Sequence, residues 1–468
     1  MLSNPVGMTR RSFSWTLCGV PLSLPAWAEE AASMPWNQPA TVARVYLASK
    51  QVHWPRPDLD VAKDVAEVEA RLKEVERRNA HNVRFVGGEV LRADEEVKPW
   101  LAKMGDIDGV LIVPVTQPIG PLRALIDALE VPALFFSRPY ATHAWSGIAA
   151  IRKREKKKLD VLATTSYGDL DPYMQIFRTV HHLRKSKIIV GAERSAGRQA
   201  TMDAYTKHFG TAMTYLDYKD LKATFESVDA AKAQKLADEF TRGALKVVEP
   251  TKQEIHNALR FYLTALEIMK REKANAFTID CFGTWPAKQM VAYPCITWSK
   301  LNDAGLYGVC EGDLPSTMTQ ILVTSYSGMP GFVSDPVFDL SRNEVIHAHC
   351  VAATKMGGLK GPSSPYIIRH HLETAEGAVL QVLMPSGQTV TVARFNGPTQ
   401  MLVSTAEVTG TVDSDRGCRS QIRTRVKDAE KWLQNYAAGL HRVIFYGDHT
   451  RALDRMGRLM GFEVVCEI

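Results

Sequence analysis

Apolar residues in the first third of the chain form short runs that alternate with amphipathic segments. Residues 42–47 and 109–115 are mostly apolar, which is typical of strands buried on both faces of a parallel sheet. Between them, residues 61–78 carry apolar side chains at intervals of three and four, which predicts a helix with a charged outer face. A further helix and a strand at 133–136 continue the alternation. The pattern predicts a doubly wound α/β domain over residues 40–158.

The same alternation resumes after a basic run at 152–158, which we interpret as a solvated connector. Short apolar runs at 161–163 and 187–190 predict strands of a second sheet. Long helices are expected to follow these strands, at 229–244 and 252–272. We therefore assign residues 159–356 to a second α/β domain, and we expect it to carry the metal site.

Beyond residue 357 the periodicity changes from helical spacing to strict alternation. Residues 377–382 and 389–395 alternate with a period of two and are separated by turn-forming residues, which predicts an antiparallel barrel or sandwich over residues 357–468. A last helix is expected near 450–460. The fold class is thus α/β, with two doubly wound α/β domains followed by a C-terminal antiparallel β-barrel-like domain.

The first 28 residues have the features of a twin-arginine signal peptide. Arg10 and Arg11 precede an apolar stretch at 13–28, which ends in the small-x-small cleavage pattern Ala26-Trp27-Ala28. This stretch is shorter than the about 20 apolar residues that span a bilayer, so no permanent membrane anchor is expected. We expect an exported, periplasmic protein.

The composition of the 468-residue chain is that of an ordinary globular protein. The 45% hydrophobic and 23% charged residues exclude a mainly disordered or collagen-like chain, and the net charge of +6 is too small to indicate a nucleic-acid partner. Six cysteines lie beyond the expected signal, and no two form a CxxC pair, so a structural zinc site has no support. Buried free thiols are expected, although export would permit disulfides.

The chain lacks several common catalytic motifs. It contains no GxSxG, HExxH, GxxxxGK[ST] or GxGxxG pattern after a strand, which argues against serine hydrolases, zincins, P-loop enzymes and simple dinucleotide oxidoreductases. Glu311, Asp335 and His349 instead lie at the ends of neighbouring predicted elements. Two carboxylates and an imidazole suit a cation such as Mn²⁺ or Mg²⁺. On spacing alone the alternative stays open that the acidic residues merely stabilise a helix start.

The segment around these residues resembles the L-fucose isomerase and L-arabinose isomerase superfamily of aldose–ketose isomerases. The resemblance covers about residues 270–468, while over 40–270 it extends only to the architecture. It is carried by 277–281, 293–295, 301–305, Cys310-Glu311-Gly312-Asp313, Gly331-Phe332-Val333-Ser334-Asp335-Pro336, His347-Ala348-His349-Cys350, 441–449 and 461–465.

The resemblance implies a divalent metal, with Mn²⁺ expected first, held by Glu311, Asp335, His349 and His441. It also implies that Glu311 and Asp335 are catalytic carboxylates that isomerise a deoxy- or pentose-type sugar through a cis-enediol, an intramolecular oxidation and reduction. His347 is a rival to His349 and a candidate sugar contact. Asp313 is a candidate support for the ligands. The family also implies a homo-oligomer.

Other residues and functions stay open at this stage. His143 and Trp145 follow a predicted strand and form a candidate sugar-facing pair, although a packed Trp beside a solvent His explains them equally well. The pair His370–His371 is expected at the surface. One alternative function is an exported glycoside hydrolase that uses Glu311 and Asp335 as its acid and base. Another is a non-catalytic sugar-binding paralogue.

Overall fold

The computed structural model describes residues 33–117, 120–285 and 289–468. The signal peptide expected over residues 1–28 lies outside the described residues. Within the described ranges, none of the helices combines the length and the apolar character that crossing a membrane requires.

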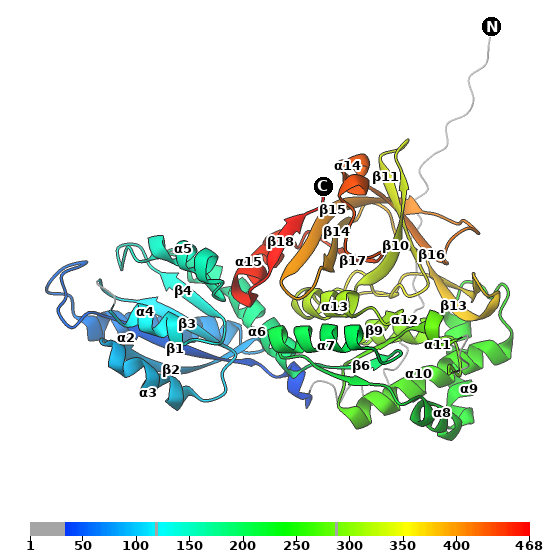
Figure 1. Ribbon diagram of the computed structural model, residues 1–468, viewed down its shortest axis with the longest axis horizontal. Coiled ribbons are helices and arrows are strands. Elements are labelled where there is room, and N and C mark those ends of the chain that lie inside the picture. The colour runs from blue at the N-terminus through cyan, green and yellow to red at the C-terminus, as the bar shows by residue number, and fades with distance from the viewer. Residues whose placement is uncertain (1–32, 118–119, 286–288) are drawn as a thin grey trace, which may run out of the picture.

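The first domain is built on a parallel five-stranded sheet at one end of the molecule (Figure 1). Its strands, in spatial order, are β2 (Val83–Leu91), β1 (Ala40–Leu47), β3 (Gly109–Pro114), β4 (Ala133–Ser137) and β5 (Leu159–Ala163). Its helices are α2 (Val61–Arg78), α3 (Val97–Met104), α4 (Gly120–Ala128) and α5 (Trp145–Glu155), with short 3-10 turns at Pro35–Asn37, Asp94–Glu96 and Tyr167–Leu170.

One predicted strand belongs to a different sheet from the one expected. The strand expected at 161–163 as the start of the second sheet is part of β5, which pairs in parallel with β4 at the edge of the first sheet. The apolar run identified the strand correctly, but apolarity does not encode which neighbour a strand pairs with.

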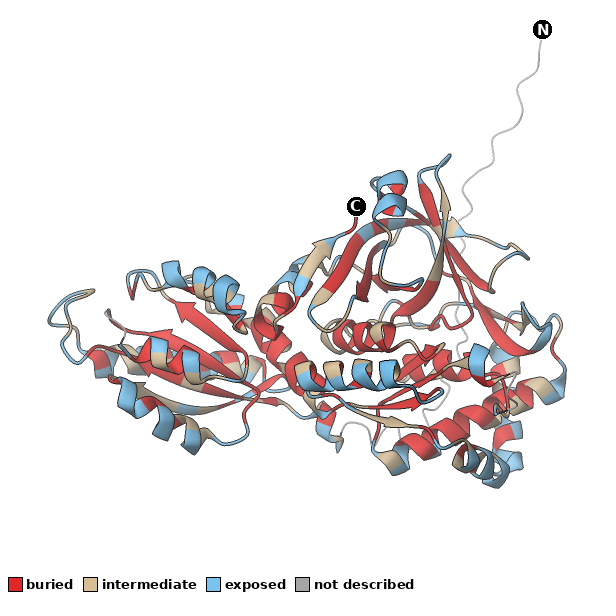
Figure 2. Ribbon diagram, viewed as in Figure 1, coloured by how far each residue is buried: buried red, intermediate tan, exposed pale blue. Residues whose placement is uncertain are grey.

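The second sheet is also parallel and contains β7 (Ala212–Tyr215), β6 (Lys187–Gly191), β8 (Ala276–Ile279) and β9 (Tyr307–Cys310), in that order. Its associated helices are α6 (Asp171–Lys185), α7 (Ala196–Phe209), α8 (Tyr218–Ser227), α9 (Ala230–Gly243), α10 (Lys252–Glu272), α11 (Cys281–Thr284), α12 (Cys295–Asp303) and α13 (Leu314–Ser327). Helix α10 begins at a capping box in which Thr251 and Glu254 each bond to the other's backbone N–H, which satisfies donors that a helix start otherwise leaves unpaired. Its apolar face is buried along its whole length (Figure 2).

The C-terminal part of the described chain forms a closed antiparallel barrel of six strands. Their spatial order is β14 (Thr389–Phe395), β17 (Arg442–Tyr446), β10 (Phe332–Asp339), β11 (Glu344–His349), β16 (Ser420–Arg425) and β15 (Gln400–Thr411), and pairing between β15 and β14 closes the ring. Strand β18 (Glu463–Cys466) adds to β15 in parallel. The expected fold class of two α/β units and an antiparallel barrel is therefore confirmed.

Two details of the barrel differ from the sequence interpretation. The expected strand at 377–382 is β13 (Glu376–Val382), which forms a separate hairpin with β12 (Tyr366–His371). Strands β10 and β11, which we expected in the second α/β domain, are barrel strands. Helix α14 (Ala429–Asn435) lies beside the barrel, and α13 lies between the barrel and the second sheet (Figure 1).

The last helix, α15 (Thr450–Met460), returns to the first domain and packs against β5. Its Arg458 Nε donates to Oδ1 of Asp160 at 2.7 Å, and Asp160 also accepts from Arg152 and from the Tyr173 hydroxyl.

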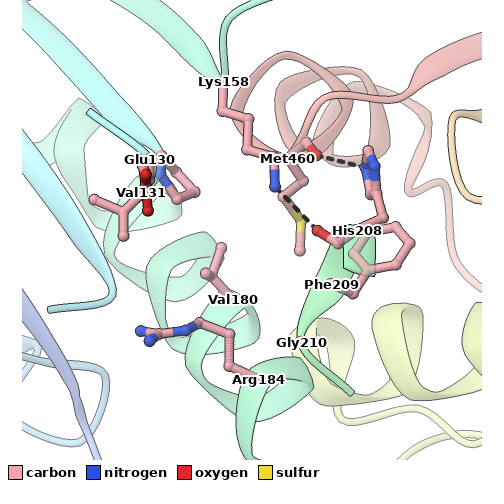
Figure 3. Close-up of a pocket in the computed structure, with 10 residues that line it drawn as sticks. Glu130, Val131, Lys158, Val180, Arg184, His208, Phe209, Gly210 and Met460 are labelled. Atoms are coloured by element: carbon pink, nitrogen blue, oxygen red, sulfur yellow. Dashed lines mark hydrogen bonds between the residues drawn. The ribbon is translucent and has the colours of Figure 1, made fainter. Parts of the chain in front are cut away.

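A cavity of about 120 Å³ lies at this junction (Figure 3). Two of the polar side chains that line it already have partners, because Lys158 Nζ donates to the His208 carbonyl and His208 Nε2 bonds to the carbonyl of Met460. The cavity therefore lies where parts of the fold pack together, and it offers few free polar groups to a ligand.

Candidate functional site

The loop between β9 and α13 presents two carboxylates toward the barrel. Glu311 has a φ of 63° and Gly312 a φ of 62°, so two successive residues adopt left-handed backbone angles. A Cβ at Gly312 would lie 3.2 Å from atoms of both Arg198 and Asp280, so glycine fits this turn. Left-handed angles at a residue other than glycine cost free energy and are found where a site fixes the geometry. The turn sets the direction in which Glu311 points.

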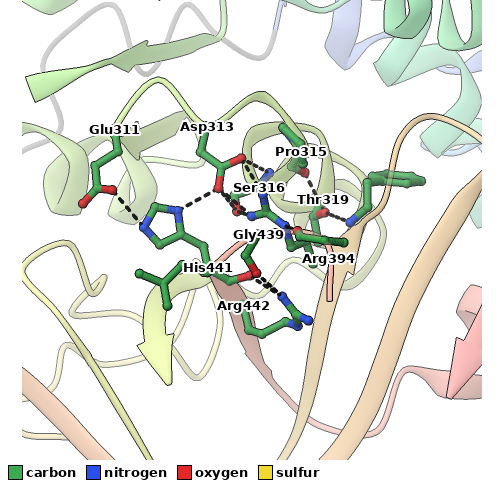
Figure 4. A network of polar contacts seen from close by, with 12 residues as sticks. Glu311, Asp313, Pro315, Ser316, Thr319, Arg394, Gly439, His441 and Arg442 are labelled. Carbon is green, nitrogen blue, oxygen red and sulfur yellow. Dashed lines mark hydrogen bonds and ion pairs between the residues drawn. The ribbon is translucent and has the colours of Figure 1, made fainter. Parts of the chain in front are cut away.

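His441 connects this loop to the barrel (Figure 4). It directly precedes β17, and its Nδ1 lies 2.7 Å from Oδ2 of Asp313. Its Nε2 lies 3.3 Å from Oε2 of Glu311 and 3.3 Å from Oδ1 of Asp335. One imidazole thus contacts three carboxylates from two parts of the fold.

Asp313 is held from a second direction by Arg394 of β14. The guanidinium donates to both carboxylate oxygens, at 2.5 and 3.2 Å, and it also donates to the hydroxyl of Ser316. The Asp313 side chain also accepts from the Ser316 backbone N–H and so caps α13. Burial alone would raise the pKa of Asp313, but the bonds from His441 and Arg394 outweigh it and hold the pKa well below its ordinary value. Asp313 is therefore a charged, immobile acceptor for His441.

A buried ion pair between Arg442 and Glu467 fixes the segment that carries His441. Arg442 and Glu467 are both nearly inaccessible to solvent and form two hydrogen bonds, at 2.9 and 2.6 Å. The remaining Arg442 donors reach the carbonyls of Ala437, Gly439 and His441. All of the guanidinium's hydrogen-bonding directions are therefore used in holding the chain that leads into His441.

His349 and Asp335 complete the cluster from barrel strands β11 and β10. His349 Nε2 lies 3.4 Å from Oε1 of Glu311. One ligand atom each from Asp335, His349 and His441 lies within 4.8 Å of the other two. Within the described residues, Asp335 Oδ1, His349 Nε2 and His441 Nε2 are buried and lack a hydrogen-bond partner of good geometry. Buried polar atoms without partners are costly, and a cation bound among them would remove that cost.

The charges of the cluster favour a cation as well. Burial would raise the pKa of Glu311, but the imidazoles of His349 and His441 lower it to about 2. Burial would lower the pKa of His441, but Asp313 and Glu311 raise it to about 10. The pKa of Asp335 is raised by burial against the attraction of the two imidazoles. The ionised carboxylates of Glu311 and Asp313 thus draw positive charge to one place.

The structure brings together the four residues that the sequence analysis proposed as ligands: Glu311, Asp335, His349 and His441. His347 does not join these four residues. Its side chain is fully buried, and its two ring nitrogens bond to the hydroxyls of Ser334 and Thr424. This arrangement leaves no ring nitrogen of His347 facing a ligand.

His143 and Trp145 do not join the cluster within one chain. Both are exposed and lie at the start of α5, on the first domain, apart from α13 and the barrel (Figure 1). The His143 ring lies against Trp54, with 4.9 Å between centroids. Their proposed sugar contact stays a prediction.

Several residues that build the site escaped the sequence analysis. Arg394, Arg442 and Glu467 belong to segments that look like ordinary strands with polar positions. Arg198 of α7 donates to the Gly312 carbonyl at 3.2 Å and lies 3.9 Å from Asp280. The one available signal was Arg442 directly before the apolar run Val443–Phe445, since an arginine that is buried there needs partners.

Comparison with known proteins gives one informative similarity. No protein-family model matches the chain. The chain is similar to a sulfoquinovose isomerase from Clostridium sp. (strain MSTE9), with 23% identity over 188 residues. The match spans 38% of this chain and 40% of that protein, so the chain covers less than half of the relative's length.

Proposed function

We propose that this protein is a metal-dependent aldose–ketose isomerase that acts on a small sugar. The observation that carries the proposal is the convergence of Asp335 Oδ1, His349 Nε2 and His441 Nε2, three buried atoms without good hydrogen-bond partners, beside the Glu311 carboxylate. The similarity to a sulfoquinovose isomerase supports a sugar isomerase in general. The deoxy- or pentose-type substrate rests on the family resemblance.

Glu311, Asp335, His349 and His441 would hold the cation. A set of carboxylate oxygens and imidazole nitrogens fits Mn²⁺, and also Mg²⁺, better than a thiolate-seeking metal. When bound, such a cation supplies Lewis acidity, which polarises the sugar carbonyl and makes the hydrogen on C2 more acidic.

The two carboxylates then divide the proton transfers. One removes the C2 proton and returns it to C1, and the other carries the hydroxyl proton between O2 and O1, so that a cis-enediol forms and collapses to the isomer. Glu311 and Asp335 are the most accessible acids of the cluster, with side chains 24% and 30% exposed, whereas Asp313 is 9% exposed. Asp313 positions His441 and does not meet the sugar.

The same geometry gives less support to a glycoside hydrolase. His441 Nε2 lies 3.3 Å from both Glu311 and Asp335, so an imidazole occupies the space between the two carboxylates. An acid and base pair for glycoside cleavage needs that space for the scissile bond or a water.

The test is metal analysis of the purified protein beside two variants. We expect about one Mn, Mg or similar ion per chain in the wild type and its loss in Asp335→Asn. Asp339→Asn, on the same strand, is the matched control and should keep the ion. The wild type should also exchange the C2 hydrogen of an aldose with solvent deuterium. A wild type that binds no metal would contradict the proposal.

We also propose that the protein is exported by the twin-arginine route and works as a homo-oligomer. Export rests on Arg10 and Arg11 and the apolar stretch after them, and replacing both arginines with lysine should keep the protein in the cytoplasm. Assembly rests on the family resemblance. Light scattering measures the number of chains in the assembly.

A further inference from the structure

A second group of possible metal ligands lies beside the first. It consists of the thiols of Cys350 and Cys418 and the imidazole of His371, with one ligand atom from each within 4.8 Å of the other two. Cys350 follows β11, Cys418 precedes β16 and His371 ends β12. Three separate segments therefore bring soft ligands to one small volume, although no CxxC pair is present in the sequence.

The spacing is close to what a tetrahedral thiolate site requires. Zinc–sulfur bonds of about 2.3 Å put two sulfur ligands about 3.8 Å apart, so atoms within 4.8 Å need to move by only about 1 Å. Two sulfurs and one imidazole select a thiophilic cation of the zinc type. The carboxylate and imidazole cluster has the opposite preference, so the two sites are expected to differ in the metals they take.

The ligands are held in place by bonds from their neighbours. The Arg419 guanidinium donates to the His370 carbonyl at 3.0 Å, which ties the segment of Cys418 to the strand of His371. The Gln421 side chain donates to the carbonyl of Cys418 at 3.0 Å. His371 Nδ1 lies 3.3 Å from the Thr374 hydroxyl, which leaves Nε2 for another partner. Such supports around ligands strengthen metal binding.

The Cys350 thiol also contacts Cys295, at the start of α12. This contact raises the pKa of Cys350 well above its ordinary value, and the bond to Cys350 together with burial raises that of Cys418. Nucleophilic cysteines have lowered pKa values. The pair is therefore poorly suited to covalent catalysis, and Cys295 is available as a third sulfur and a fourth ligand.

We propose that Cys350, Cys418 and His371 form a second metal site, which binds Zn²⁺. The site stands on its own ligands and does not depend on the isomerase proposal. Because Cys350 directly follows His349, Zn²⁺ at this site would also fix the end of β11 from which His349 reaches the first site.

The experiment uses Co²⁺ as a spectroscopic substitute for Zn²⁺ in the full, reduced and metal-free protein. We expect thiolate-to-cobalt charge-transfer absorption that is lost when one equivalent of Zn²⁺ is added and that persists in excess Mg²⁺. Cys418→Ser should abolish this absorption. Cys466→Ser, which removes an exposed thiol bonded to the Ile468 carbonyl, is the matched control and should retain it.

Two further variants separate this site from the first. Asp335→Asn should keep the charge-transfer absorption, and this result should not depend on whether the variant still binds Mn²⁺. If Cys418→Ser does not fold, His371→Gln should show a changed visible spectrum of bound cobalt. The proposal is overturned if the wild type shows no thiolate absorption, if Cys418→Ser retains it, or if thiol titration finds Cys350 and Cys418 joined as a disulfide after isolation without reductant.

Discussion

Nδ1 of His441 lies 2.7 Å from Oδ2 of Asp313, and this contact decides which ring nitrogen faces the cluster. Since the charged carboxylate only accepts, Nδ1 carries the hydrogen and Nε2 points toward Glu311 and Asp335. Arg394 holds the carboxylate from its other side. The direction in which Nε2 points is thus set by residues from two domains.

Asp313→Asn should weaken metal binding without removing a ligand. An amide holds the imidazole less firmly and lowers its basicity, so we expect metal affinity to fall by about 10- to 100-fold. Metal titration with a competing chelator measures the change. Because Asp313 also caps α13, Asp217→Asn at the cap of α8 is the matched control, and it should leave metal affinity unchanged. Equal losses in both variants would show that capping alone explains the effect.

Glu467→Gln should destabilise the barrel strongly. The substitution leaves the buried Arg442 without its counter-charge, and breaking a buried pair in this way costs about 3–5 kcal/mol. Chemical denaturation followed by circular dichroism measures the free energy of unfolding. Glu407→Gln breaks the exposed pair with Arg425 and should cost at most about 1 kcal/mol. A similar small loss in Glu467→Gln would mean that the buried pair contributes little.

Gly308→Ala should disturb the strand that leads to Glu311. The added Cβ would lie 2.5 Å from Cα and 3.0 Å from the carbonyl oxygen of Trp298, and backbone atoms cannot move aside cheaply. Overpacking of this kind costs about 1–3 kcal/mol or more. In the described part of the chain, the added Cβ of Gly410→Ala meets nothing within 4 Å, so this variant is the control. The melting temperatures of the two variants should therefore differ, and equal values would contradict the expected clash.

His182 should make stability fall in acid. Its Nδ1 bonds to the Trp36 carbonyl, and its Nε2 accepts from the Tyr307 hydroxyl. Burial, with help from nearby Arg178, lowers its pKa from 6.5 to about 3, so the unfolded chain binds the proton more readily. The contribution of His182 to the free energy of unfolding is therefore fully present above pH 6.5 and is lost as the pH falls toward 3. The loss is about 2 kcal/mol at pH 5.

Denaturation at pH 7 and pH 5 measures this loss. His182→Gln should reduce the difference between the two pH values, whereas His81→Gln, at an exposed position, should not. An unchanged difference in His182→Gln would assign the acid sensitivity to other groups.

Local features of the chain were predictable because local forces determine them. Helix α10 spans Lys252–Glu272, as the apolar spacing predicts. Its capping box and its buried face are both determined by residues close together in the sequence. The sequence of a strand alone does not determine which other strands it pairs with. The run at 161–163 therefore predicted a strand but not its place beside β4.

The candidate site shows the same division. Glu311, Asp335, His349 and His441 were found through a family resemblance, and the structure brings them together. Arg394 was missed because period-two alternation marks it as an outward polar position, whereas it is buried against Asp313, 81 residues earlier in the chain. The soft ligands Cys350, His371 and Cys418 were missed because only the fold brings such distant residues together.

The contact between Asp160 and Arg458 joins residues 298 positions apart. During translation, all five strands of the first sheet are made long before α15 exists. Until then, among the residues that the structure describes, the buried Asp160 has only Arg152 and Tyr173 as partners, and the surface of β5 that α15 covers is open to water. A nascent chain of this protein therefore cannot finish the packing of its first domain until α15 has been translated, and a chain that stops before α15 would leave this surface of β5 uncovered.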